Sequence, residues 1–331
     1  MKIAFFALRD FDELDFCRKY SALYGIDYVW TPEYPNKDNL RLAAGCDGVS
    51  FTPCEITEEY VDVFHDCGVK FISCRSIGYD HLPCAYIRAK GMHVTTSPYP
   101  TQCVADYALM LILMTTRKIK QTMIRAMAQD YTLKGKMGKT ISSCTVGVIG
   151  TGNIGTILIK HLAPLGCRIL ACDPHPKAEL AQYAEYVAVD ELYARSDVIS
   201  LHLPASASTY HMIDAAAIAK MPEGVIIINT ARGTLIDTKA LIAGLKSGKV
   251  GGAAIDVLEN ENGLYYYNRC GDNIDNDEFA VLRSFPNVIC TPHTAFYVES
   301  TVANMIEKSF LPLVYYGRGE AYPYEIDLSR F

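Results

Sequence analysis

The sequence lacks the features that mark several common classes of protein. Its longest apolar segment, residues 107–114, is far shorter than the ~20 residues that cross a membrane. Lysines and arginines are scattered, so we expect no basic surface for nucleic acid. The N-terminal run MKIAFFAL is interrupted at once by Arg9 and Asp10, which favours a first strand over a signal peptide. We therefore expect a cytoplasmic protein that binds neither nucleic acid nor membrane.

The 12 cysteines do not form a disulfide or metal-binding pattern. They lie one at a time along the chain, with no C-x-x-C pair and no Cys/His cluster of zinc spacing. Reduced, mostly buried thiols in a reducing compartment are the simpler interpretation, and we expect no metal. Charged residues make up 21% of the chain and its formal net charge is -6, an ordinary composition for a globular protein.

A chain of 331 residues exceeds the ~250–300 residues at which one hydrophobic core stops growing, so two domains are expected. In the first hundred residues, short apolar runs alternate with amphipathic stretches, which is typical of βαβ units and a parallel sheet. An almost wholly apolar helix is expected over about 103–120 and must be buried. Expected strands lie at 2–8, 27–30, 47–51, 70–74 and 93–97, and expected helices at 12–24 and 57–67.

A second βαβ series begins at Thr145. It is followed by a last helix over 299–316, beyond the end of the series. The fold class predicted is therefore α/β, with two doubly wound parallel-sheet domains: a flavodoxin-like domain of residues 1–100 plus 299–331, and a Rossmann domain of 101–298 inserted into it. Strands are expected at 145–149, 168–172, 186–189, 197–203, 224–230, 250–257 and 287–291, and a helix at 238–247.

A buried strand runs into the pattern G-x-G-x-x-G at Gly150, Gly152 and Gly155, and then into an apolar helix. The first glycine permits the tight turn, the second lets the backbone approach a pyrophosphate, and the third allows helix and strand to pack closely. The pyrophosphate would bind the free amides at the start of the helix, near Asn153 and Ile154. Such a pattern is weak evidence alone.

Asp173 strengthens the prediction of a dinucleotide site. It follows the next strand, eighteen residues after Gly155, where a carboxylate accepts hydrogen bonds from the adenosine ribose. An acidic group there repels a 2′-phosphate, so NAD is expected rather than NADP, although the nearby Lys177 weakens this preference.

Three further segments, NTARG at 229–233, DVLENE at 256–261 and TPHTAF at 291–296, follow the glycine motif in order. With them the chain resembles the D-2-hydroxyacid dehydrogenase family over essentially its whole length. It is most similar to D-lactate dehydrogenases of the fermentative and vancomycin-resistance type, through NENGLYYY at 260–267 and HTAFY at 293–297. The resemblance implies NAD-dependent interconversion of 2-oxo acids and (R)-2-hydroxy acids, with pyruvate and D-lactate as the expected pair.

The residue types suit this reaction without reference to the family. Arg232 offers a planar fork for a substrate carboxylate, although a lone arginine after a strand more often forms a salt bridge. Histidine is the side-chain type whose ordinary pKa lies near neutrality, so His293 can exchange a proton with the substrate oxygen. Glu261 would orient its imidazole and stabilise the imidazolium. In isolation these two would be a structural histidine and a solvated carboxylate. A formate dehydrogenase of this fold would carry a neutral amide in place of Glu261.

Further site residues are implied by the resemblance. The substrate carboxylate is expected to bind the backbone amides of Ile77 and Gly78, in a cleft that Arg232 also lines. Tyr99 matches a substrate-contacting tyrosine, although Pro100-Thr101 departs from the Ser-Pro usual after it and leaves this role open. Phe296 matches an aromatic pocket wall. Expected cofactor contacts on the Rossmann side are Pro204, Thr230, Ala231 and Asp256, whereas His202 is interpreted as structural.

Two kinds of alternative remain. The first is a reductase of a larger 2-oxo acid, such as 4-methyl-2-oxopentanoate, phenylpyruvate or 2-oxoglutarate, or of glyoxylate or hydroxypyruvate. The second is an NAD(H)-sensing, corepressor-like interaction protein, a class that usually carries disordered tails, which we do not expect here. Residues 119–141 resemble the dimerisation arm of the family, so a homodimer is expected by analogy.

Overall fold

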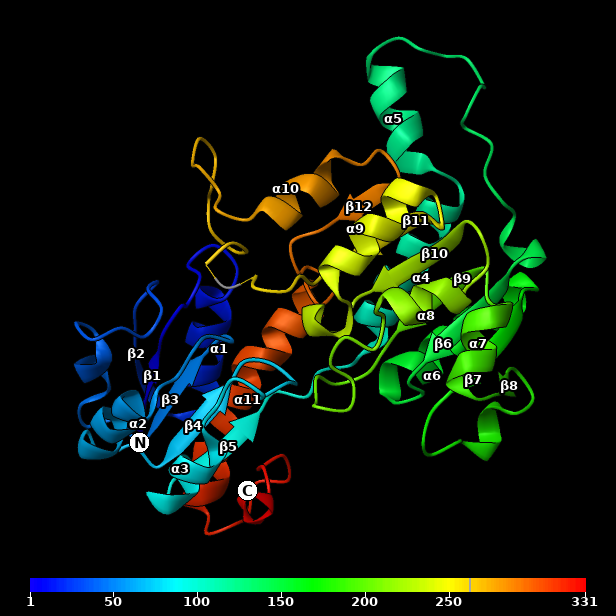
Figure 1. The fold of residues 1–331 in the computed structure, drawn as a ribbon. Helices are drawn as coiled ribbons and strands as arrows, with labels where there is room; N and C mark the ends of the chain where they lie inside the picture. The colour runs from blue at the N-terminus through cyan, green and yellow to red at the C-terminus, as the bar shows by residue number, and fades with distance from the viewer. Residues whose placement is uncertain (262) are drawn as a thin grey trace. The chain divides into compact units, whose positions relative to one another are not determined.

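A computed structural model describes residues 1–261 and 263–331. Those residues divide into two compact units, one of residues 1–100 with 297–331 and one of residues 101–296. The chain thus returns to the first unit at Tyr297, whereas the sequence placed this return at residue 299. Figure 1 shows the course of the chain through both units.

The first unit is built on a five-stranded parallel sheet, in the order β2-β1-β3-β4-β5. Alternate residues of a strand point to opposite faces, and β1 follows this rule. Ile3 and Phe5 pack with the helices α1 and α11, whereas Ala4 and Phe6 pack on the other face, where α2 and α3 lie. The strands are β1 (Lys2–Phe5), β2 (Asp27–Trp30), β3 (Gly48–Phe51), β4 (Phe71–Cys74) and β5 (His93–Thr96), and the helices are α1 (Leu14–Tyr24), α2 (Glu58–Asp66), α3 (Cys84–Ala89) and α11 (Glu299–Gly317).

The second unit is built on a seven-stranded parallel sheet, in the order β12-β11-β10-β9-β6-β7-β8. The strand order reverses between β6 and β9, which is the position where doubly wound folds bind their ligands. The strands are β6 (Thr145–Ile149), β7 (Arg168–Cys172), β8 (Glu185–Tyr186), β9 (Val198–Leu201), β10 (Val225–Asn229), β11 (Val250–Ile255) and β12 (Val288–Cys290). The helices are α4 (Gln102–Thr116), α5 (Ile119–Met127), α6 (Asn153–Leu162), α7 (Val189–Arg195), α8 (Ala215–Lys220), α9 (Thr238–Ser247) and α10 (Asp277–Ser284).

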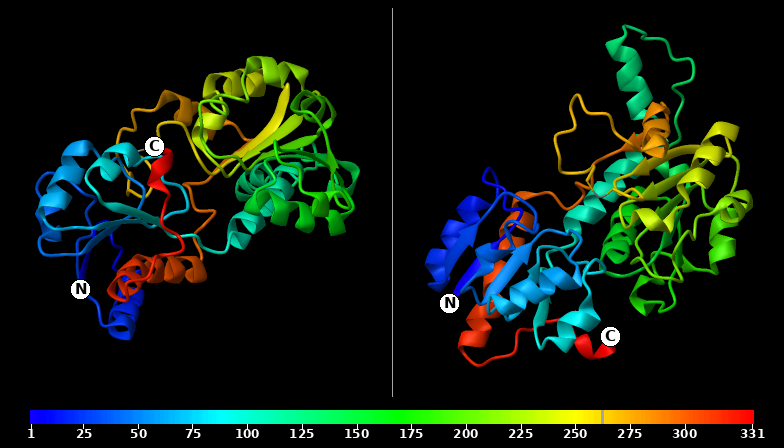
Figure 2. Two further views of the ribbon diagram at one scale, coloured as in Figure 1. Left: turned by 90° about the horizontal axis from the view of Figure 1, so that it is seen from below. Right: turned by 60° about the vertical axis from the view of Figure 1, so that its left-hand side comes forward.

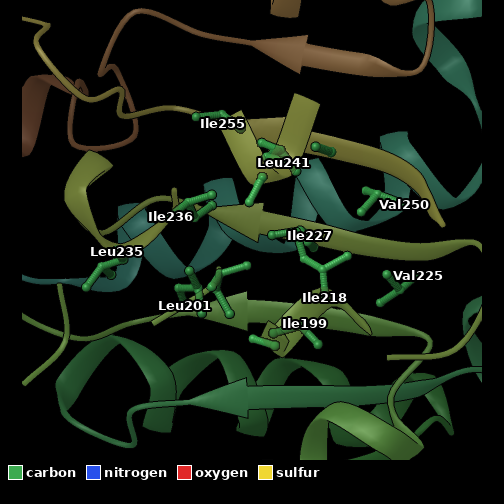
Figure 3. Packing of buried hydrophobic residues seen from close by; sticks show 14 of the residues in the cluster. Ile199, Leu201, Ile218, Val225, Ile227, Leu235, Ile236, Leu241, Val250 and Ile255 are labelled. Atoms are coloured by element: carbon green, nitrogen blue, oxygen red, sulfur yellow. The ribbon is translucent and has the colours of Figure 1, made fainter. Parts of the chain in front are cut away.

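Helices cover both faces of this sheet. Ile226 and Ile228 of β10 lie in the cluster that α4 and α6 complete. Between them, Ile227 points to the opposite face and packs among residues of α8 and α9, including Ile218 and Leu241 (Figure 3). Because both faces are buried, the central strands are continuous apolar runs rather than alternating ones.

Two sequence predictions about elements are wrong. The helix expected over about 103–120 ends at Thr116, because Lys118 adopts a left-handed conformation (φ 51°) and a new helix, α5, begins at Ile119. The strand expected at 186–189 is reduced to the two residues of β8, since Val189 already begins α7. Helix α5 and the segment after it project from the second unit (Figures 1 and 2).

The described residues include no helix long and apolar enough to cross a membrane. They also contain no group of three potential metal ligands, and none of the 12 cysteines forms a disulfide. Burial raises the pKa of several of these thiols, to about 12 for Cys17 and Cys54 and to about 11 for Cys290. These thiols are therefore protonated and unreactive at neutral pH.

Candidate active site

The glycine motif lies at the carboxyl end of β6, beside the point where the strand order reverses. Gly150 has a φ of +93°, and a Cβ atom there would lie 2.4 Å from the carbonyl oxygen of His202. A Cβ atom on Gly155 would lie 2.0 Å from the carbonyl oxygen of Gly150. Gly152 faces open space, with no atom within 4 Å of an added Cβ. The protein's own packing thus requires the outer two glycines, and the middle one leaves the start of α6 clear for an anion.

Asp173 follows β7 and accepts hydrogen bonds from the backbone amides of Thr151 (2.6 Å) and His175 (2.8 Å). Burial acts to raise the pKa of this carboxyl, but the amide hydrogen bonds outweigh it, and the net shift is downward. Asp173 is therefore ionised at neutral pH. Lys177 donates to the hydroxyl of Thr156 (3.0 Å).

The remaining predicted cofactor residues lie at the carboxyl ends of β9 and β10. The hydroxyl of Thr230 is buried and has no hydrogen-bond partner among the described residues. The amide of Ala231 donates to the side chain of Asn229 (3.0 Å), and Pro204 is exposed after β9. An unsatisfied buried hydroxyl is costly, so the Thr230 hydroxyl fits a bound polar group. Together with the open glycine turn and the ionised Asp173, these features fit NAD.

His293 and Glu261 form a hydrogen-bonded pair. Nδ1 of His293 lies 2.6 Å from Oε1 of Glu261, whose Oε2 accepts the amide of Leu258 (2.8 Å). The carboxylate is thereby held by its own loop while it orients the imidazole. The other ring nitrogen, Nε2, has no hydrogen-bond partner in the described part of the chain. This is the arrangement that an acid–base histidine needs.

Asp256, at the end of β11, holds the turn that carries His293. Its buried carboxylate accepts the hydroxyl of Thr291 (2.6 Å) and the amides of Thr294 and Ala295 (both 2.9 Å). Its backbone oxygen accepts the amide of His293 (2.7 Å), which has a positive φ of 53°. The observed contacts of Asp256 thus fix the position of His293, and its contact with the cofactor stays a prediction.

Arg232 follows β10, the strand next to β11. The side chain of Asn229 donates to its backbone oxygen (2.8 Å) and so fixes the turn. The next residue, Gly233, lies against the following loop: a Cβ there would lie 2.1 Å from the carbonyl carbon of Leu258. The loops that carry Arg232 and Glu261 therefore rest directly on one another.

Arg232, Glu261 and His293 follow three adjacent strands, β10, β11 and β12, at their carboxyl ends. Residues separated by up to 61 positions in the sequence are brought to one edge of a single sheet. This is the edge at which open α/β sheets bind their ligands.

The first unit holds the other predicted substrate residues, after β4 and β5. The amides of Ile77 and Gly78 have no hydrogen-bond partner among the residues that the structure describes. The preceding Arg75 is fully buried and forms an ion pair with Glu13 (3.1 Å), which anchors the start of this loop. Tyr99 is partly buried in the loop that follows β5.

Sequence reasoning missed two features beside the predicted residues. Tyr266 donates a hydrogen bond to the backbone oxygen of His293 (2.8 Å). Its place in the run Tyr265-Tyr266-Tyr267 does not distinguish it from its neighbours. A second imidazole–carboxylate pair joins His211 and Glu259 (2.6 Å). The sequence signal for it was the pattern E-x-E, in which Glu259 precedes Glu261 by two residues.

Comparison with known proteins places this site in a class. The family model of the D-isomer specific 2-hydroxyacid dehydrogenase NAD-binding domain matches residues 109–295. An aromatic 2-oxoacid reductase of Clostridium sporogenes is 37% identical over 95% of both chains. A D-specific alpha-keto acid dehydrogenase of Enterococcus faecalis is 40% identical over 90% of this chain and 91% of its own. A solved D-lactate dehydrogenase of Treponema pallidum is 31% identical, with a TM-score of 0.88, and the match covers 99% of this chain and all of that one.

The fold and the matches define an oxidoreductase that uses NAD and acts on a small 2-oxo or 2-hydroxy acid. The chain belongs to the D-isomer specific 2-hydroxyacid dehydrogenase family. The predicted family, the two parallel-sheet domains and the cofactor NAD are therefore confirmed.

Proposed function

We propose that this enzyme reduces pyruvate to D-lactate, with His293 as the group that transfers the proton. The observation that carries the proposal is the short contact between His293 and Glu261, beside the turn of Arg232. A carboxyl partner on Nδ1 leaves Nε2 as the nitrogen that exchanges a proton with the substrate oxygen. A 2-oxo acid needs such a donor because its carbonyl becomes an alkoxide during reduction.

The roles of the other residues follow from their chemistry. When bound, NADH supplies the hydride from its nicotinamide ring. Arg232 binds the substrate carboxylate through its planar fork and polarises the adjacent carbonyl. The amides of Ile77 and Gly78 are further donors for the carboxylate, and Tyr99 and Phe296 contact the substrate side chain. His293 gives its proton to the developing alkoxide, and Glu261 stabilises the imidazolium until it does so.

The cofactor is held by residues around the point where the strand order reverses, between β6 and β9. The start of α6, at Asn153 and Ile154 after the three glycines, binds the pyrophosphate. Asp173 accepts hydrogen bonds from the adenosine ribose, and its lowered pKa keeps it ionised, which disfavours the 2′-phosphate of NADP. Further contacts come from Pro204, Thr230, Ala231 and Asp256.

A larger 2-oxo acid is the second candidate substrate. Two observations favour it: the relative in Clostridium sporogenes is an aromatic 2-oxoacid reductase, and the rings of Phe296 and Tyr266 lie beside the imidazole of His293. Substrates of this kind include phenylpyruvate and 4-methyl-2-oxopentanoate. The reaction and the catalytic residues are the same for either substrate.

Oxidation of NADH, followed at 340 nm, tests both candidates. The panel contains pyruvate, phenylpyruvate, 4-methyl-2-oxopentanoate, 2-oxoglutarate, glyoxylate and hydroxypyruvate, and the chirality of each product is determined. Fastest turnover of pyruvate to the (R) product supports the first proposal, and faster turnover of a larger acid supports the second. Absence of turnover with every acid, despite NADH binding, would contradict the proposed function and point to an NAD(H)-sensing protein.

We also propose that the enzyme is a cytoplasmic homodimer that serves fermentative metabolism. The support for a dimer is the apolar surface of α5 and the segment after it, which includes the exposed side chains of Met123, Met127, Leu133 and Met137. A patch of this kind usually marks an interaction surface. Sedimentation of the wild-type protein and of a Met127→Glu, Leu133→Glu variant tests this: a wild-type monomer would contradict it.

A further inference from the structure

Tyr266 lies in the loop between β11 and α10, and its ring is next to the imidazole of His293. The two ring centroids are 6.1 Å apart, and the Tyr266 hydroxyl donates to the His293 backbone oxygen at 2.8 Å. Both residues have a positive φ, 68° for Tyr266 and 53° for His293. Aromatic and other large residues rarely adopt this conformation, and they keep it where the surroundings impose it. The backbone of this loop is therefore shaped so that the phenol reaches His293.

Phe296 completes a group of three rings. Its centroid lies 6.5 Å from that of Tyr266 and 6.4 Å from that of His293, with interplanar angles of 79° and 81°. Both contacts are edge-to-face, within the ~4.5–7 Å at which aromatic pairs attract one another. The three ring centroids thus form a nearly equilateral triangle, in which the two aromatic rings contact each other as well as the imidazole.

The neighbours of Tyr266 show that this ring is presented outward. Tyr265 is only 7% exposed and packs against Phe279 in the core, at 6.0 Å. Tyr266 is 51% exposed although its hydroxyl is engaged with His293. Tyr267, 47% exposed, lies instead beneath the guanidinium of Arg269. The three successive tyrosines thus make different contacts: Tyr265 packs in the core, Tyr266 contacts His293, and Tyr267 contacts a surface arginine.

We propose that Tyr266 is a specificity-determining residue: its ring, together with that of Phe296, binds the side chain of aromatic 2-oxo acids and raises their turnover relative to pyruvate. This inference rests on the proposed function, because it takes His293 as the proton donor to the substrate oxygen. The reacting carbonyl must come within hydrogen-bond reach of the imidazole. In an arylpyruvate one methylene separates that carbonyl from the ring, so the ring comes within reach of side chains that contact the imidazole. The methyl group of pyruvate offers far less surface to them.

The hydroxyl of Tyr266 has a separate role, because its hydrogen bond positions the backbone of His293. Removing the hydroxyl should affect all substrates equally, since it displaces the proton donor and leaves the ring in place. Removing the ring should in addition lower the preference for an aromatic side chain. The two variants Tyr266→Phe and Tyr266→Ala therefore separate positioning from specificity.

The experiment measures kcat/KM for phenylpyruvate and pyruvate in the wild type and in Tyr266→Phe, Tyr266→Ala and Tyr267→Ala. The ratio phenylpyruvate to pyruvate should fall about tenfold in Tyr266→Ala, which corresponds to about 1.4 kcal/mol, and should stay within about twofold in the other two. The matched control Tyr267→Ala removes an equally exposed ring from the same loop. A ratio unchanged in Tyr266→Ala, or lowered as much in Tyr267→Ala, would overturn the inference.

A binding measurement keeps this test separate from that of the proposed function. Calorimetry with 3-phenyllactate on the NADH-loaded protein reports side-chain recognition without turnover, because the hydroxy acid and NADH are both already reduced and no hydride can pass between them. Affinity about tenfold weaker in Tyr266→Ala than in the wild type and Tyr267→Ala supports the inference. Equal affinity in all three proteins overturns it, even where turnover has confirmed the reaction. Absence of turnover by the wild type, by contrast, contradicts the proposed function. The binding result then decides whether the ring of Tyr266 recognises an aromatic side chain.

Discussion

Two imidazole–carboxylate pairs flank one short loop of the second unit, and they differ in what surrounds them. Glu261 and His293, and Glu259 and His211, are each joined at 2.6 Å. Glu261 accepts a hydrogen bond from an amide of its own loop, and among the described residues His293 is its only side-chain hydrogen-bond partner. Glu259 also accepts the hydroxyl of Thr238 (2.9 Å), at the start of α9. The second pair thus connects three segments of the unit, whereas the first serves the histidine.

The two histidines also differ in the aromatic rings that surround them. The ring of His211 is stacked on that of Tyr210, with centroids 3.9 Å apart, and its backbone amide donates to the oxygen of Thr234. His293 lies among rings at more than 6 Å, with Nε2 unengaged among the described residues. Both imidazoles are 28% exposed, so the difference lies in their neighbours: a stacked tyrosine and a carboxylate shared with α9 for His211, and two more distant rings and a carboxylate of its own for His293.

The largest expected effect comes from removing His293. His293→Ala should lower kcat/KM for the best 2-oxo acid by about 10²–10⁴-fold, because no group then protonates the alkoxide. The affinity for NADH, measured by fluorescence, should not change. His211→Ala is the matched control and should retain activity within about tenfold of the wild type. Comparable losses in the two variants would remove the distinction between the pairs.

The second expected effect is that of Glu261→Gln. Glutamine keeps a hydrogen-bond acceptor for Nδ1 but removes the charge that stabilises the imidazolium. A charge-assisted hydrogen bond contributes about 1.5–3 kcal/mol, so kcat/KM should fall roughly 10- to 100-fold. Glu261→Asp, which restores the charge with a shorter reach, should recover part of the loss. Wild-type rates in Glu261→Gln would show that the charge is not used.

A smaller effect, on stability rather than rate, is expected for Glu259→Gln. The pair with His211 is partly exposed, with side-chain exposures of 28% for His211 and 16% for Glu259, so its loss should lower the free energy of unfolding by only about 1 kcal/mol. Steady-state kinetics should change by less than about threefold. Urea denaturation with parallel kinetics measures both quantities. A tenfold loss of kcat/KM without loss of stability would assign this pair to the reaction.

A third histidine, His202 at the end of β9, should make the free energy of unfolding depend on pH. It has no carboxylate partner among the described residues, and burial lowers its pKa to about 4 from the ordinary 6.5. Below pH 6.5 the unfolded chain takes up a proton that the folded chain refuses, so stability is fully present above that pH and falls as the pH drops toward 4. The expected loss reaches about 1–3 kcal/mol. Denaturation curves from pH 7 to pH 4 should show this slope in the wild type and a reduced slope in His202→Gln.

Much of the fold could be predicted from sequence patterns. The strands β2, β6 and β7 and the helix α9 have the bounds that the apolar runs and the terminal Gly248 predicted. These patterns are reliable because a strand covered on both faces must be apolar throughout. The break at Lys118 was not predictable, because nothing in the local sequence marks a lysine that adopts the left-handed conformation. That conformation depends on the direction in which residues 119–141 leave the end of α4. The helices α3 and α8 have six residues each, which is too short for a helical periodicity of apolar residues to be recognised in the sequence.

The candidate site divides in the same way. Arg232, Glu261 and His293 could be found because each stands in a short motif, and the strand order then places the three motifs side by side. Tyr266 could not be found, since its ring reaches His293 only through a positive φ in a loop without periodicity. Their catalytic roles, and the substrate among the 2-oxo acids, remain predictions for the experiments above.

The sequence by itself determined the family and the cofactor class, and it predicted the positions of the groups that the reaction needs. These are set by local patterns: a strand followed by G-x-G-x-x-G, an acid after the next strand, and an Arg, a Glu and a His at strand ends. Only the tertiary structure showed that Glu259 pairs with His211, and that Tyr266 is the one of three successive tyrosines that contacts His293. The physical reason is that hydrogen bonds and ring contacts of this kind join loops whose relative positions depend on the packing of the whole sheet.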